Sequence, residues 1–145
     1  MKSKKKFKAR EGSPFSVKDA QKIGEELELI KSKESLNPKN VLKRAKSKKS
    51  ILHQYFEWDD SLASEKWRLQ QARGIVSHVV EIVVIRGNEE EVRGFVNVIA
   101  VSGEKEYVTH TEAMTIPSYK KQLLGEMETT LENLLRLIKL FSSME

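Results

Sequence analysis

The sequence predicts an α+β fold, with helices first, then a three-stranded antiparallel β-meander, then one long helix. Apolar residues recur at helical spacing over residues 14–75, β-branched residues and polar turns dominate residues 76–114, and helical spacing returns over residues 116–143. Strands that follow one another, rather than alternating with helices, indicate α+β architecture. We therefore expect a single domain over residues 14–145.

The composition limits the possible chemistry. A chain of 145 residues accommodates one domain, and its lack of cysteine excludes disulfides, thiolate metal ligands and cysteine nucleophiles. The basic N-terminus lacks the apolar segment of a signal peptide, and no apolar run is long enough to span a bilayer. We expect a cytoplasmic protein without membrane contact.

Charge is distributed unevenly along the chain. Residues 1–49 carry 16 Lys and Arg against 6 Asp and Glu, a balance of +10, whereas residues 50–145 carry 10 against 15, a balance of −5. A strongly basic half indicates contact with nucleic acid or another anionic surface, although solvated helix faces produce the same pattern. Residues 1–13 have too little apolar surface to offset the entropy of ordering, so a disordered basic arm is expected there.

Capping signals mark the first two helices. Ser16 and Asp19 have the spacing of a capping box, and Gly24 inside the following helix predicts close packing against another element. Asn37 is a favourable N-cap for a second helix, which has Pro38 at its first position. Both helices should therefore begin at defined residues.

A third helix is expected to follow the sequence EWDD. Asp59 or Asp60 is the expected N-cap, because a carboxylate there accepts orphan amide bonds and faces the positive end of the helix dipole. The residues expected to point inward are Leu62, Trp67 (or Ala63), Leu69 and the region of Ile75. Trp58 is expected to pack the loop against the core rather than to stack on nucleic-acid bases.

The middle of the chain is expected to form three strands. They lie within residues 74–87, 92–103 and 107–114, which are rich in β-branched and aromatic residues. The polar sequences NEEE and EKE separate them. Connections this short join neighbouring antiparallel strands.

The last helix, over residues 116–143, has the most regular pattern in the chain. Pro117 suits its first turn, and apolar residues then alternate at spacings of three and four, as in a coiled-coil seam. Packing on the protein's own sheet and pairing with a second copy both explain such a seam. The predicted homodimer interface comprises Leu124, Met127, Leu131, Leu134, Ile138 and Phe141.

No residue pattern predicts catalysis. His53 lies near Asp59 and Asp60, but a helix cap already accounts for one of these carboxylates. His78 and His110 belong to no metal-binding motif, and the glycines form no phosphate-binding loop. We expect no catalytic residue, no metal ligand and no cofactor, and hence a protein that is not an enzyme.

The sequence favours binding to duplex DNA. The second and third helices resemble a helix-turn-helix in outline, with a longer connection than usual. Ser and Gln bond base edges, whereas Lys and Arg contact phosphates or guanine. Acidic residues at the expected start of the third helix oppose this interpretation, because they repel phosphates. The predicted contacts are Lys39, Lys43, Arg44, Lys46, Lys48, Lys49, Ser64, Lys66, Arg68, Gln71 and Arg73.

The stretch from residue 52 to 73 resembles a signature of small, largely uncharacterised proteins encoded by bacteriophages and prophages of Firmicutes. Trp67 stands where that family more often has tyrosine, and the similarity extends through EEEVRGFVNV to the last helix. The resemblance implies a phage-encoded accessory protein inside the host cell and supplies no catalytic residues. The matching residues are Leu52, His53, Phe56, Glu57, Trp58, Asp59, Asp60, Glu65, Trp67, Arg68, Gln71, Ala72 and Arg73.

Two functions are therefore compatible with the sequence. The first is a non-catalytic DNA-binding accessory or regulatory protein of a phage or prophage. The second is a protein-interaction module that binds a host or phage protein, or takes part in assembly. That module would act through the acidic half of the chain and the leucine-rich last helix.

Overall fold

The computed structural model describes residues 4–62 and 64–144 and shows a mixed α+β protein, which confirms the predicted fold class. The chain has two compact units, residues 1–110 and 111–145. The elements are β1 (Lys6–Ala9), η1 (Val17–Asp19), α1 (Ala20–Lys33), α2 (Pro38–Ala45), η2 (His53–Tyr55), α3 (Glu65–Ser77), β2 (Val79–Ile85), β3 (Asn88–Arg93), β4 (Phe95–Ile99), β5 (Lys105–Thr109), α4 (His110–Thr115) and α5 (Pro117–Ser142).

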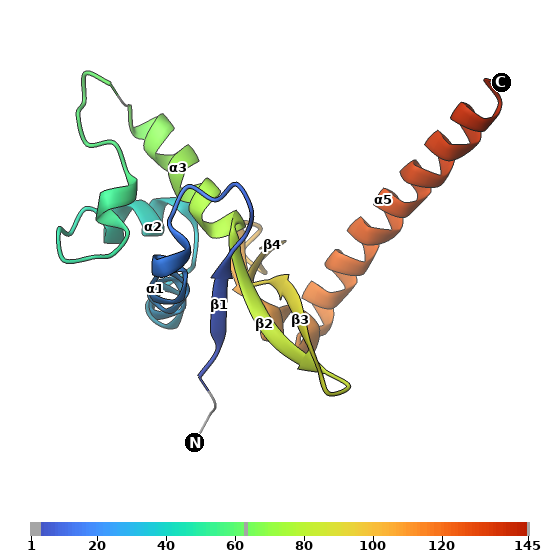
Figure 1. Ribbon diagram of the computed structural model, residues 1–145, viewed down its shortest axis with the longest axis horizontal. Coiled ribbons are helices and arrows are strands. Elements are labelled where there is room, and N and C mark those ends of the chain that lie inside the picture. Colours follow the sequence, from blue (N-terminus) through green and yellow to red (C-terminus); the bar gives the residue numbers. More distant parts are fainter. Residues whose placement is uncertain (1–3, 63, 145) are drawn as a thin grey trace. The chain divides into compact units, whose positions relative to one another are not determined.

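A three-stranded antiparallel sheet is present, with the strand order β1-β2-β3 (Figure 1). Its members differ from the predicted meander, because the N-terminal β1 supplies one edge. The expected strand at residues 92–103 is divided at Gly94, whose amide donates to the carbonyl of Val79 at 3.0 Å. The chain then leaves this sheet, and β4 pairs with β5 in a separate antiparallel hairpin.

The N-terminal segment is a strand and not a disordered arm, so that prediction was wrong for residues 6–9 (residues 1–3 lie outside the described part). The ring of Phe7 is buried, and its amide donates to Oε1 of Gln21 at 2.8 Å. Lys4 pairs with Glu25 at 2.8 Å, and Lys8 pairs with Glu91. Burial of one ring and neutralisation of the neighbouring lysines offset the ordering entropy that the composition suggested would prevail.

Helix α1 packs against β1 but begins later than its capping signals suggest. Its stripe of Ala20, Ile23, Leu27 and Ile30 is buried, as the spacing predicts. The capping box does not form, because Asp19 accepts a hydrogen bond from the hydroxyl of Tyr55 instead of capping the helix. Tertiary contact with η2 has replaced the local bond.

Helix α2 forms as its capping residues predict. The side chain of Asn37 accepts a hydrogen bond from the amide of Asn40 at 2.8 Å, and Pro38 occupies the first turn. Val41 and Leu42 are buried on its inner side. Local signals are sufficient to place this helix.

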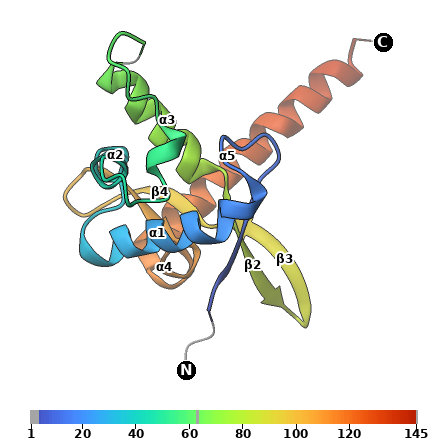
Figure 2. The ribbon, with the colours of Figure 1, turned by 60° about the vertical axis from the view of Figure 1, so that its left-hand side comes forward.

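The expected third strand, residues 107–114, ends early. Strand β5 stops at Thr109, and His110 begins α4. Glu112 and Ala113 are better helix formers than strand formers, which explains the change of structure. Figure 2 shows the β2–β3 hairpin, which ends in a turn with positive φ at Arg86 and Gly87.

The second unit consists mainly of α5, a single continuous helix that starts at Pro117 as predicted (Figure 1). None of its residues is buried. The predicted seam residues lie on it with exposures between 48% and 67%. Within the described residues, no helix combines the length and the apolar character needed to cross a bilayer.

Candidate nucleic-acid interface

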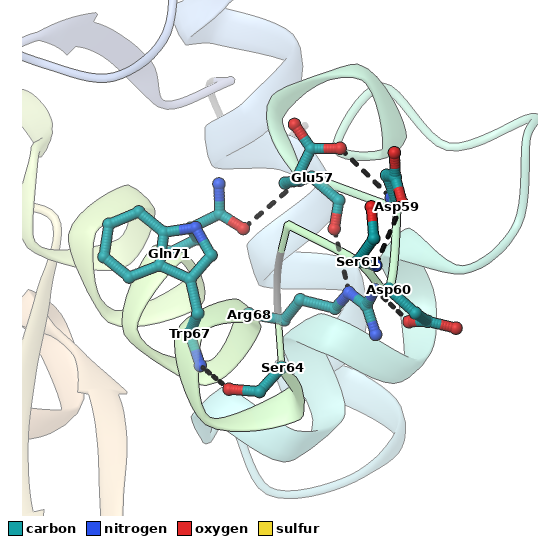
Figure 3. Close-up of polar contacts among 8 residues, drawn as sticks. All are labelled: Glu57, Asp59, Asp60, Ser61, Ser64, Trp67, Arg68 and Gln71. Carbon is teal, nitrogen blue, oxygen red and sulfur yellow. Dashed lines mark hydrogen bonds and ion pairs between the residues drawn. The ribbon is translucent and has the colours of Figure 1, made fainter.

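The acidic pair before α3 forms a turn and does not cap the helix, so the prediction for Asp59 and Asp60 was wrong. Oδ1 of Asp59 accepts hydrogen bonds from the amide of Ser61 at 2.9 Å and from its hydroxyl at 2.6 Å (Figure 3). These bonds lower the pKa of the Asp59 carboxyl. Helix α3 starts later, at Glu65, where Oγ of Ser64 accepts from the amide of Trp67 at 3.4 Å. An Asp side chain that closes its own turn is no longer available as a cap.

Arg68 ties this turn to α3. Its Nε donates to the carbonyl of Glu57 at 2.8 Å, and its Nη2 pairs with Asp60 (Figure 3). The guanidinium lies 5.5 Å from the centroid of the Trp58 ring, within the range of a cation–π contact. Only 13% of the Arg68 side chain is exposed. Arg68 therefore joins α3 to the preceding turn, and contact with DNA would require these bonds to break.

Two more of the α3 residues that were predicted to contact DNA form hydrogen bonds within the protein. Oε1 of Gln71 accepts from the amide of Glu57 at 3.2 Å, and Ser64 caps the helix (Figure 3). Lys66 and Arg73 are exposed, and Arg73 donates to Gln70 at 3.3 Å. Of the predicted α3 contacts, only these two cations therefore present their charge to solvent.

The aromatic residues before α3 pack the loop, as predicted for Trp58. The ring of Trp58 stacks on His53 with centroids 4.8 Å apart, and its Nε1 donates to the carbonyl of His53 at 2.8 Å. Phe56 is buried, and the centroid of its ring lies 5.6 Å from that of Trp58. Nδ1 of His53 in turn lies 2.8 Å from the carbonyl of Ala45 at the end of α2. These contacts are the internal packing of the loop against α2 and the core.

Leu62 and Trp67 are exposed, which corrects the prediction that they point inward. Leu62 precedes α3, and Trp67 is 51% exposed. The prediction is confirmed for Ile75, which is buried with Ala72 and Val76, and Leu69 packs partly against the core. Trp67 lies in the first turn of α3, ahead of these buried residues, and the alternative Ala63 lies outside the described residues.

Helix α2 presents lysines on one exposed face. Lys39, Lys43 and Lys46 follow the spacing i, i+4, i+7 and therefore share a side of the helix. All three are exposed, whereas Val41 and Ala45 are buried. This geometry separates a charged face from an apolar one.

Arg44, also a predicted contact, turns inward. Its Nε donates to Oε1 of Glu26 at 2.6 Å, and the hydroxyl of Ser50 donates to the same oxygen at 3.0 Å. Lys43 approaches Glu34 at 3.4 Å in an exposed pair. Glu26 lies far away in the sequence, so no local pattern marks Arg44 as neutralised.

Lys48 and Lys49 follow α2 in an ordered turn. The amide of Ser47 donates to the carbonyl of Arg44 at 3.2 Å, and the amide of Ser50 donates to the carbonyl of Ser47 at 3.0 Å. In the described structure, Lys39, Lys46, Lys48 and Lys49 form no ion pair. We call residues 39–49 the basic segment; it lies within residues 35–56, which contain no Asp or Glu.

The short helix connection lies at a different place from the one expected. Residues 34–37 join α1 to α2, whereas residues 46–64 separate α2 from α3. A helix-turn-helix has a turn of three or four residues. The residues between α1 and α2 match this length, and those between α2 and α3 do not.

No family model, curated protein or solved structure matches this chain. The described residues also contain no group of three or more His, Asp or Glu side chains arranged to hold a metal ion.

Proposed function

We propose that this chain is a non-catalytic nucleic-acid-binding protein that contacts the phosphates of duplex DNA through the basic segment. The supporting observation is the set of exposed lysines on α2 and its following turn, with no acidic residue in residues 35–56. Lysines arranged in this way neutralise phosphates and release counterions. The bacteriophage signature around Trp58 supports an accessory or regulatory role of a phage or prophage protein in the host cytoplasm.

The proposed mode of binding depends little on DNA sequence. Phosphate contacts position a protein on the duplex, whereas base contacts specify the sequence. Ser64, Arg68 and Gln71 already have partners within the protein. Lys66 and Arg73 add charge on α3 without the fixed geometry that a base edge demands. We therefore expect similar affinities for unrelated duplexes.

The test is a fluorescence-anisotropy titration of a labelled random-sequence duplex at about 50 mM and about 200 mM salt, between which several phosphate contacts lose orders of magnitude in affinity. A triple variant, K46Q/K48Q/K49Q, should reduce the slope of log K against log salt by roughly three. Absence of binding at the lower salt concentration would refute the proposal.

The matched control removes the same charge elsewhere. Lys18, Lys22 and Lys105 are exposed residues outside the basic segment. The K18Q/K22Q/K105Q variant changes net charge equally and should retain most of the slope. Equal losses in both variants would show that only net charge matters, which contradicts a defined interface.

A second candidate function is protein interaction, favoured by the exposed apolar seam of α5. A contiguous exposed apolar surface often marks a partner site. Homodimerisation through the predicted seam is one form of this function, and binding to a host or phage protein is the other. A pull-down from nuclease-treated host lysate distinguishes the second form from DNA binding, because a stoichiometric protein partner would survive the nuclease.

A further inference from the structure

We propose that two copies of this chain pair through α5 in antiparallel orientation, with Leu131 of one copy opposite Leu134 of the other. The inference rests on the proposed self-association and adds the orientation and register of the helices. It concerns α5 alone and does not depend on the basic segment. Its experimental outcome is therefore independent of DNA binding.

A second copy is the partner that best fits the spacing of the seam. The exposed residues alternate at three and four over most of α5, and a helix with this repeat packs best against another helix of the same repeat. In heptad notation, the a positions are Leu124, Leu131 and Ile138, and the d positions are Met127, Leu134 and Phe141.

The positions beside the seam allow close approach. Glu128 is the one charged residue at an e or g position between residues 123 and 142. The other flanking residues are Leu123, Thr130, Leu135, Leu137 and Ser142. Partner choice in parallel coiled coils is usually set by charged e and g pairs, and α5 lacks them.

The residues at a also disfavour a parallel pair. Parallel two-stranded coils prefer β-branched residues at a, but two of the three a positions here are leucine. In an antiparallel pair each a residue meets a d residue, so Leu124 lies opposite Phe141 of the partner copy. Phe141, the largest residue of the seam, is then paired with a leucine and not with a second phenylalanine.

The helix dipoles favour the same orientation. A parallel pair aligns the two dipoles, whereas an antiparallel pair opposes them.

The native lack of cysteine makes orientation directly measurable. We would prepare L124C and F141C variants of the full chain with tags of different size, and treat them singly and mixed with a short bismaleimide cross-linker. Because the two positions are about 25 Å apart along α5, an antiparallel pair should cross-link only in the mixture. Self-cross-linking of L124C alone would overturn the orientation.

Self-association itself is tested by sedimentation of the cysteine-free chain at tens of micromolar. A dimer is expected, and L131D should weaken it roughly 100-fold or more, because the seam would bury an unpaired carboxylate. The matched control is T129D, which adds the same charge on the opposite side of α5. A monomeric parent chain would overturn the dimer together with its orientation, whereas a dimer with parallel cross-links would overturn the orientation alone.

Discussion

The ring of Phe7 occupies the space that a side chain at Gly24 would need, since a Cβ atom built on Gly24 would lie 2.2 Å from two of the ring carbons. Phe7 also stacks on Phe95, with ring centroids 6.1 Å apart. One glycine in α1 thus allows the N-terminal strand to enter the core. The close packing predicted for Gly24 is confirmed, and its partner is the segment expected to be disordered.

The variant G24A should therefore be destabilised by about 1–3 kcal/mol, as for overpacking of a filled core, even though alanine is the better helix former. Urea unfolding followed by circular dichroism measures the change. The control is G74A in α3, where a Cβ atom meets nothing within 4 Å. G74A should stabilise the protein by up to about 1 kcal/mol. Equal effects of the two substitutions would contradict the Phe7–Gly24 contact.

Loss of the Arg68 side chain should reduce stability and leave DNA binding intact. R68M removes the bond to the Glu57 carbonyl and the contact with Trp58, with an expected cost of about 1–3 kcal/mol. R73M, at an exposed position on the same helix, should change stability by no more than about 0.5 kcal/mol. Unfolding and salt-dependent anisotropy are measured on both variants. A large fall in DNA affinity for folded R68M would restore Arg68 as a contact residue.

Glu81 should make stability depend on pH. The residue is 5% exposed, and its Oε2 has no hydrogen-bond partner among the described residues. Burial raises the pKa of this carboxyl above its ordinary value of 4.5, against a smaller opposing effect of Lys5. Below about pH 4.5 the Glu81 carboxyl is protonated in both the folded and the unfolded state, so its contribution to the stability of the fold is fully present there. This stability is lost as the pH rises through the folded-state pKa, because the folded state must then bury a charged carboxylate.

The E81Q variant keeps the shape of the side chain and removes its titration. Its Tm should exceed that of the parent chain near pH 8, and the difference should shrink as pH falls toward about 4. The exposed Glu90 on β3 provides the control E90Q. A constant difference between E81Q and the parent over this range would rule out the buried titration.

The cap of α2 should be worth about 1 kcal/mol. N37A removes the bond to the Asn40 amide, and loss of such caps typically costs about 0.5–2 kcal/mol. S35A is the comparison, because Ser35 is exposed and its side chain makes no hydrogen bond that the described structure shows, so stability should change by less than about 0.5 kcal/mol. Thermal unfolding of both variants measures the difference. An S35A effect as large as that of N37A would contradict the capping role of Asn37.

Elements specified by neighbouring residues were predictable. Helix α2 follows from Asn37 and Pro38, and α5 follows from Pro117 and the repeat of its leucines. These signals act within one or two helical turns, so they do not depend on the rest of the chain. The α+β class follows from the same changes of periodicity.

The candidate site was only partly predictable, because its charges are paired over long distances in sequence. The lysines of α2 remain exposed as their spacing predicts, but Arg44 is neutralised by Glu26 and Arg68 is held by Glu57 and Asp60. Which cations retain their charge for a ligand depends on contacts that appear only in the folded chain.

By itself, the sequence determined the periodicity of the helices, the cap of α2 and the seam of α5. Tertiary structure decided that residues 6–9 form an edge strand, paired with residues 79–82 of β2. It also decided that Asp59 closes a turn before α3. The physical reason is that a strand or a cap has several local alternatives of similar free energy, and burial of distant partners such as Phe7 and Gly24 selects among them.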